Sequence, residues 1–208
     1  MIPFSAEVFF ASLEDYNATI WPRQILFLTL GLACIWFTLN PTPRRGQMTG
    51  LILAAAWFHT GVTYHFGYFA ELNFWDYLIG GVYLMQAVLL LIWLWRGKFS
   101  APRYSPLSAA LISSGLLLMP LIVFVFGRSI TETGWFGTAP VPTLVVTAGA
   151  LVYAAPRSLV LWLLPALASV AALVPAVSLP LYEDVFAGLV LAVFLWLLTS
   201  ANKNRDDA

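Results

Sequence analysis

Long apolar stretches separated by short polar segments make up most of this chain. Seven of these stretches approach the roughly 20 residues that a helix needs to cross the hydrocarbon core of a bilayer. We expect transmembrane helices at about residues 22–39, 48–67, 75–95, 106–127, 140–155, 158–179 and 183–200. The predicted fold class is therefore all-α, a polytopic membrane helix bundle that forms one integral membrane domain over residues 1–208.

Local signals refine the ends of these elements. Residues 1–21 mix aromatic and acidic side chains, so we expect an external helix on the membrane surface, with Ser5 as its N-cap. Ser105 followed by Pro106 is typical of a helix start, because serine caps the free N–H groups and proline suits the first turn. The polar residues 201–208 form a predicted cytoplasmic tail.

Charged residues alternate between successive connections, and this alternation predicts the orientation. With the N-terminus outside, eight of the ten basic residues lie in cytoplasmic segments, and only Arg23 and Arg128 lie outside. Eight of the ten acidic residues lie outside in the same arrangement. Short cytoplasmic loops are enriched in Lys and Arg. We therefore expect a seven-helix protein of the inner (cytoplasmic) membrane of the cell, with its N-terminus outside and its C-terminus in the cytoplasm.

Composition excludes several classes of protein. Hydrophobic residues make up 61% of the chain and charged residues 10%, against about 25% charged in soluble domains, so the expected solvent is the lipid bilayer. The net charge is zero and the longest basic run is Arg44–Arg45, so nucleic acid is not an expected partner. The single cysteine, Cys34, lies in an apolar run and is expected to be a buried thiol. The two lysines, Lys98 and Lys203, lie at cytoplasmic ends, so a retinal Schiff base is not expected.

The first candidate functional group is His59, in the aromatic-rich segment 57–77. It lies about eight residues below the outer end of its predicted helix, at a depth of roughly 12 Å. A neutral imidazole there needs a hydrogen-bond partner, and Gln86 on the next helix is a candidate. Two interpretations stay open: a structural bond between helices, or a substrate contact or proton-handling group.

The second histidine, His65, follows His59 by six residues, so the two side chains point about 120° apart around the helix. They are not an i,i+4 metal pair. The chain offers only His65, Glu71 and Glu14 as candidates for a metal site, with no third histidine and no cysteine partner. The alternative is that His65 is an interfacial residue among the aromatic side chains of the membrane boundary.

Acidic residues near predicted helix starts also allow two interpretations. Asn73 with Asp76, and Glu183 with Asp184, suit N-caps and first-turn acids, which interact favourably with the helix dipole. The same acids would form an acidic vestibule that attracts cations. The two interpretations are compatible.

Three sequence motifs resemble those of a known family. The segments YNATIWPRQ (residues 16–24), YHFGYFAELN (64–73) and FGTAPVPT (136–143) are similar to motifs of a family of bacterial multi-pass membrane proteins, a domain of unknown function. The resemblance spans most of the chain and implies the fold and the membrane location, but no activity. On the predicted topology all three motifs lie at the outer face, which suggests a shared external site.

Three hypotheses about function follow. The first is a small-solute or ion permease or binding protein with an extracytoplasmic site. The second is an accessory subunit of a membrane complex, or a homo-oligomer, whose aromatic rim docks a partner. The third is a membrane-embedded enzyme that uses His59 or His65. For the first hypothesis, the candidate substrate-binding residues are Asn17, Trp21, Gln24, His59, His65, Asn73, Gln86, Thr138 and Pro140.

Overall fold

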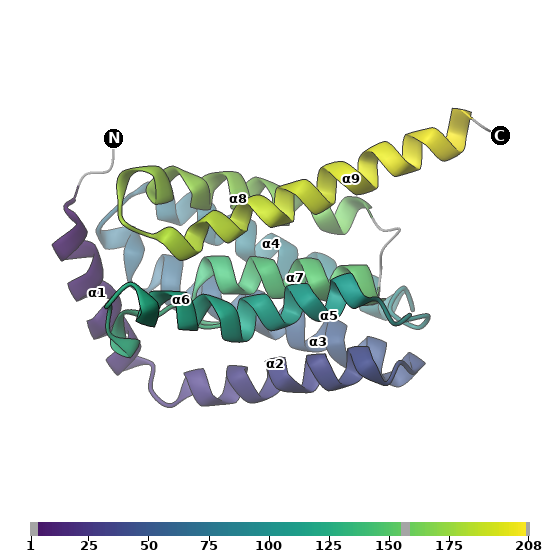
Figure 1. Ribbon diagram of the computed structural model, residues 1–208, viewed down its shortest axis with the longest axis horizontal. Helices are drawn as coiled ribbons and strands as arrows, with labels where there is room; N and C mark the ends of the chain where they lie inside the picture. Colours follow the sequence, from purple (N-terminus) through teal and green to yellow (C-terminus); the bar gives the residue numbers. More distant parts are fainter. Residues whose placement is uncertain (1–3, 155–158, 207–208) are drawn as a thin grey trace.

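The computed structural model describes residues 4–154 and 159–206. Within these ranges the chain is helical and no strand occurs, so the predicted all-α class is confirmed. Figure 1 shows the longer helices side by side, with α1 lying across one end of the bundle. The α-helices are α1 (Ala6–Thr19), α2 (Arg23–Leu39), α3 (Pro43–His59), α4 (Trp75–Trp95), α5 (Pro106–Ser113), α6 (Met119–Val125), α7 (Pro140–Ala154), α8 (Leu159–Ser178) and α9 (Ala187–Asp206).

Shorter helical segments extend or join these helices. Two are π-helices: η1 (Thr60–Phe66) continues α3, and η3 (Ser114–Leu118) joins α5 to α6. The others are the 3₁₀ helices η2 (Phe69–Glu71), η4 (Ile130–Glu132) and η5 (Tyr182–Phe186). A π-turn takes up an extra residue and so turns the following side chains around the helix axis, and such turns occur often at functional sites.

The predicted helix starts at Ser5 and Ser105 agree with the structure. The Ser5 hydroxyl accepts a hydrogen bond from the backbone N–H three residues later, at 3.5 Å, and caps α1. The Ser105 hydroxyl caps α5 in the same way at 3.4 Å, with Pro106 in the first turn. At α4 the cap position is Phe74, which has no side-chain cap, so the predicted N-cap by Asn73 is wrong; the Asn73 side-chain oxygen accepts from the Trp75 N–H at 3.3 Å, and Asp76 lies in the first turn as expected. Local capping chemistry therefore set the starts of α1 and α5.

The structure supports several helices of membrane-spanning character but does not confirm the expected seven. Among the described residues, four segments are long and apolar enough to cross a membrane: Trp75–Trp95, Pro106–Val125, Leu159–Ala176 and Tyr182–Thr199. The pair α1 and α2, bent by 84°, makes a fifth if it is one broken span. The structure thus supports an all-α chain with several apolar helices, compatible with a membrane protein. The count of seven is not confirmed, because α2, α3 and α7 have 17, 17 and 15 residues respectively.

The short helix α7 lies at the centre of the bundle, packed against α3, α5 and α8. Nearly all its residues are buried, so α7 contacts other helices on all sides. Its single glycine, Gly149, allows close packing: a Cβ there would come within 2.8 Å of the Ser108 carbonyl oxygen on α5. Polar bonds join it to α3, where Trp57 Nε1 donates to the Thr147 hydroxyl at 2.8 Å. Small residues and interhelical hydrogen bonds are typical of helix packing in membranes.

Candidate functional site

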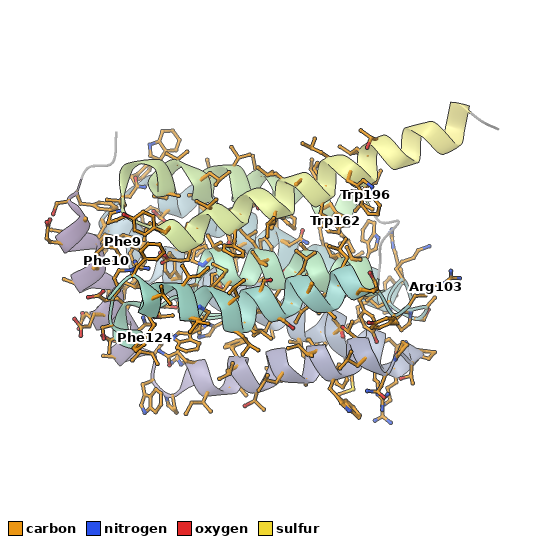
Figure 2. The ribbon with its side chains drawn as sticks, viewed as in Figure 1. Phe9, Phe10, Arg103, Phe124, Trp162 and Trp196 are labelled. Carbon is orange, nitrogen blue, oxygen red and sulfur yellow. The ribbon has the colours of Figure 1, made fainter. Side chains whose placement is uncertain are left out.

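The three sequence motifs meet at the end of the bundle that α1 covers. The Tyr16 hydroxyl, on α1, donates to the Thr138 carbonyl at 2.6 Å and lies 3.2 Å from the Thr63 hydroxyl in η1. The Tyr16 ring also lies edge-on to the Tyr64 ring, with 5.4 Å between ring centres, so one tyrosine contacts all three motif regions. Figure 2 labels Phe9 and Phe10 of α1, and Phe124 of α6, at this same end of the bundle. The expectation that the motifs lie together agrees with these contacts.

Two residues predicted to contact a solute instead hold the backbone of this end together. Asn17 Nδ2 donates to the carbonyls of Thr131 and Thr133, at 2.7 and 3.0 Å. Gln24 Nε2 donates to the Asn17 carbonyl at 2.7 Å. Both side chains are buried. Their amide nitrogens are thus used inside the protein, and neither residue lines the cavity described below.

His59 has a different partner from the one expected. Its Nδ1 lies 2.7 Å from the carbonyl oxygen of Gly137 and donates to it. Gln86, the expected partner, donates to the Leu161 carbonyl at 3.0 Å. The prediction of a bond between these two side chains was wrong. The carbonyl oxygen of Gly137, in the turn before α7, is the hydrogen-bond partner of His59 Nδ1 instead. A structural role for His59 Nδ1 follows, and neither side chain lines the cavity.

Beneath α1 lies a cavity of about 450 Å³. Its walls come from α1, from η1 and η2, from the beginnings of α4 and α7, and from α8 and η5. Phe9 and Leu13 of α1 border it on the side of the bundle end. Apolar and aromatic side chains make up most of the lining. The polar lining residues are Tyr64, His65, Asn73, Asp76, Tyr83, Glu183 and Asp184.

A histidine–carboxylate pair lies in the wall of this cavity. His65 Nδ1 is 2.7 Å from Asp76 Oδ1, and the His65 side chain is 3% exposed. A carboxylate only accepts, so Nδ1–H donates and the other ring nitrogen, Nε2, is left as an acceptor in the neutral ring. Nε2 is buried and has no protein partner. The same holds for the hydroxyl of Tyr83, a residue that is 0% exposed.

Two adjacent acids of η5, Glu183 and Asp184, form another part of the cavity wall. The carboxylate of Glu183 forms an ion pair with the guanidinium of Arg128, which follows α6. That guanidinium also lies 4.6 Å from the centre of the Phe10 ring on α1. The second oxygen of Glu183, Oε2, is buried without a partner. Asp184 follows directly, and both acids line the cavity before α9 begins.

The loop outside the cavity carries a perturbed tyrosine. The Tyr68 hydroxyl donates to a carboxylate oxygen of Asp15, on α1. Partial burial, and then this hydrogen bond, raise the pKa of Tyr68 above its ordinary value. The neutral phenol is therefore the stable form in the folded protein. This contact ties the loop before η2 to α1.

The structure brings three of the predicted substrate-binding residues to the cavity and not the others. His65, Asn73 and Pro140 line it. Trp21 is 65% exposed on the surface, and the Thr138 hydroxyl donates to the Trp135 carbonyl at 3.2 Å. These last two predictions of solute contact do not fit the cavity, because Trp21 faces outward and Thr138 is buried in the turn.

The weakly supported metal site is also not assembled. Glu14 accepts a hydrogen bond from the Thr131 hydroxyl at 3.0 Å, and Glu71 is exposed outside the cavity. In the part of the chain that the structure describes, no three residues among His, Cys, Asp and Glu come together in a way that could hold a metal ion. His65 is buried in the cavity wall while Glu14 and Glu71 are exposed, so the three predicted ligands do not form a coordination sphere.

Sequence reasoning missed Tyr83 and the pairing of His65 with Asp76. A signal for Tyr83 was present: it follows Asp76 by seven residues, which places both on one face of α4. The ion pair of Arg128 with Glu183 spans 55 residues of sequence. No local pattern indicates such a contact.

Comparison with protein families places the chain in one of them. The model of a family described as "Family of unknown function (DUF6064)" matches residues 6–206. The chain belongs to this family. The match confirms the expectation of an uncharacterised domain family that covers most of the chain. Among curated proteins and solved structures, nothing matches. The end cavity is therefore the feature that bears on function.

Proposed function

We propose that this protein is a multi-pass membrane protein that binds a small solute in the end cavity, as a permease or as a binding protein. One observation carries the proposal. Two buried polar groups without a protein partner, His65 Nε2 and the Tyr83 hydroxyl, belong to residues that line a cavity of about 450 Å³. An unsatisfied buried polar group costs about 1–3 kcal/mol. A solute that hydrogen-bonds to these groups removes that cost.

The shape and lining of the cavity support this proposal. Small-molecule sites are typically cavities of roughly 300–1,000 Å³ with mostly apolar walls and a few polar groups that orient the ligand. Here the aromatic and aliphatic residues supply the apolar walls, and the polar groups come from η1, α4 and η5. Residues from six or more separate segments meet at this one cavity, and ligand sites between helices of a bundle are built in this way.

The proposed topology places this end of the bundle outside the cell. We infer seven membrane-crossing helical runs, from α2, from α3 with η1, from α4, from α5 to α6, from α7, from α8, and from η5 with α9. The cavity end carries the acids Asp76, Glu183 and Asp184. Figure 2 shows Arg103 at the opposite end. Basic residues favour the cytoplasmic side, so the cavity is proposed to face the extracytoplasmic side.

A second candidate function, a membrane-embedded enzyme, is favoured by the His65–Asp76 pair. A histidine whose Nδ1–H is held by a carboxylate presents Nε2 as a general base, and the carboxylate stabilises the imidazolium that forms. In this hypothesis Nε2 takes a proton from a bound solute. Chemical conversion of a bound solute by the wild-type protein but not by His65→Gln would distinguish this hypothesis from binding alone.

Filling the cavity tests the binding proposal. Ala172, on α8, lines the cavity, and Ala172→Phe places a ring inside it. Leu167, on the same helix, is exposed and serves for the matched control Leu167→Phe. Thermal unfolding of the purified protein in lipid nanodiscs, with a panel of small amines, alcohols, carboxylates, amino acids and sugars, reports binding through a raised Tm.

The binding proposal expects at least one solute to raise the Tm of wild type and Leu167→Phe, but not that of Ala172→Phe. If no solute in the panel raises the Tm, or if the rise persists in Ala172→Phe, the cavity is not a binding site. Uptake of a stabilising solute into proteoliposomes then separates a permease, which shows flux, from a binding protein, which does not.

A further inference from the structure

We propose that the solute bound in the end cavity is a small organic cation, a protonated amine with an apolar body. This inference rests on the solute-binding function proposed above and names its chemical class. Three properties of the cavity support it: the hydrogen-bonding type of its unpartnered groups, the sign of the charge on its walls, and its aromatic lining.

The unpartnered groups of the cavity mostly accept hydrogen bonds. The tautomer imposed by Asp76 leaves His65 Nε2 as an acceptor. Glu183 Oε2, a carboxylate oxygen, is also an acceptor and is buried without a partner. The Tyr83 hydroxyl accepts or donates. An ammonium group carries up to three donors and no acceptor, so it matches these groups, whereas a carboxylate, which only accepts, would leave His65 Nε2 and Glu183 Oε2 unsatisfied.

The walls of the cavity are acidic. Three acidic side chains line it, those of Asp76, Glu183 and Asp184. His65 pairs with Asp76 and Arg128 with Glu183, and no lysine or arginine is among the residues that line the cavity. Carboxylates in a cavity with low-dielectric walls concentrate their field there and attract cations. A cationic solute therefore suits these walls better than an anionic one.

Aromatic rings border the same space. Tyr64 and Phe69 stack at 4.1 Å between ring centres, and both line the cavity, as do Phe9, Trp75 and Tyr83. The faces of such rings attract cations, and desolvation strengthens the attraction. The small apolar side chains of α8, among them Ala168 and Ala172, leave room on the other wall for an apolar body. Acids combined with aromatic rings thus favour an organic cation over a hydrated metal ion.

Three probes test the inference: 2-phenylethylamine, 2-phenylethanol and 3-phenylpropionate, which share a phenylethyl body and carry a cationic, a neutral and an anionic head group. Binding to the full-length protein is measured by calorimetry at pH 7 in nanodiscs of phosphatidylcholine, whose zwitterionic headgroups do not select for cations. The heat measured when a probe is added to Ala172→Phe comes from partition of the probe into lipid, and it is subtracted from the heat measured with the wild type. We expect the amine to bind at least about tenfold more tightly than the alcohol, and the carboxylate more weakly than either.

Two variants test the contributions of the Asp184 carboxyl group and the Tyr83 hydroxyl. Asp184→Asn should lower the affinity for the amine by about tenfold and leave that for the alcohol unchanged. Tyr83→Phe removes only a hydroxyl without a partner and should lower the affinity for the amine by a smaller factor. Glu71→Gln is the matched control, because Glu71 is an exposed acid outside the cavity at the same end of the molecule. It should bind the amine as wild type does.

Each result decides between the two proposals. Equal or tighter binding of the alcohol or the carboxylate, abolished by Ala172→Phe, overturns the cation inference and leaves the solute-binding function standing. Tight amine binding that Asp184→Asn does not change also overturns it. If none of the three probes binds to wild type, the cation inference fails, and the solute panel described above decides the binding function separately.

Discussion

The replacement Gly137→Ala should be among the most destabilising single-methyl changes in this protein. Gly137 lies in the turn before α7 with φ at +73°, and its carbonyl accepts from His59. A residue with a Cβ in this left-handed region costs about 1–2 kcal/mol. The Cβ would also lie 2.1 Å from the Phe27 ring, which cannot yield as a flexible chain end can. Overpacking of this kind costs about 1–3 kcal/mol, so the sum is about 2–5 kcal/mol.

Two other glycines separate these costs. Gly127 has a similar φ of +75°, but a Cβ there meets no atom within 4 Å, so Gly127→Ala should cost only about 1–2 kcal/mol. Gly81, within α4, has neither feature. Because alanine favours a helix, Gly81→Ala should be neutral or stabilise by up to about 1 kcal/mol.

The assay is equilibrium unfolding in mixed micelles of increasing SDS content, followed by circular dichroism, for the wild type and the three variants. The expected order of stability is Gly81→Ala, then Gly127→Ala, then Gly137→Ala. If Gly137→Ala loses no more free energy of unfolding than Gly127→Ala, the close contact with Phe27 is absent and the reasoning about this turn is refuted.

Three further predictions concern bonds around the same end and the core. Asn17→Ala removes two donors from the carbonyls of the segment after α6, so it should lower the free energy of unfolding by about 1–3 kcal/mol, and an unchanged SDS midpoint would contradict it. Trp57→Phe leaves the Thr147 hydroxyl without its indole donor and should cost about 1–3 kcal/mol, with Trp95→Phe, an exposed site, as the control. The pKa of Tyr68 is raised in the folded state, so its contribution to stability is full below about pH 10 and is lost as the pH rises through the raised value. The fall in Tm above about pH 10 should therefore be smaller in Tyr68→Phe than in wild type; equal slopes would show that Tyr68 contributes nothing.

The helices and their starts were predictable because the interactions that set them lie within one helical turn. Capping by Ser5 and Ser105 depends on residues within one turn, and both caps occur in the structure. The predicted third span, residues 75–95, coincides with α4. The structure does not confirm the number of spans, because α2, α3 and α7 have 17, 17 and 15 residues, fewer than the roughly 20 that a straight crossing needs.

The candidate site was only partly predictable. His65 and Asn73 were singled out and line the cavity, because polar residues near a membrane are few and each one is informative. His59 and Gln86 were also singled out for this reason, yet each bonds to a backbone carbonyl elsewhere. Rarity of a polar residue indicates that it has a partner, but not whether that partner is the protein or a solute.

The amino-acid pattern predicts a helical, apolar chain divided into runs near the length of a bilayer crossing, and it marks the three motifs that meet at one end. The pairing of His65 with Asp76, and that of Glu183 with Arg128 beside the same cavity, depend on how the helices pack together. This difference follows from the apolar surface of the helices. In a soluble protein the apolar face of a helix shows which side packs inward. In lipid both the packed and the exposed faces are apolar, so the pattern along the chain does not show which side chains meet.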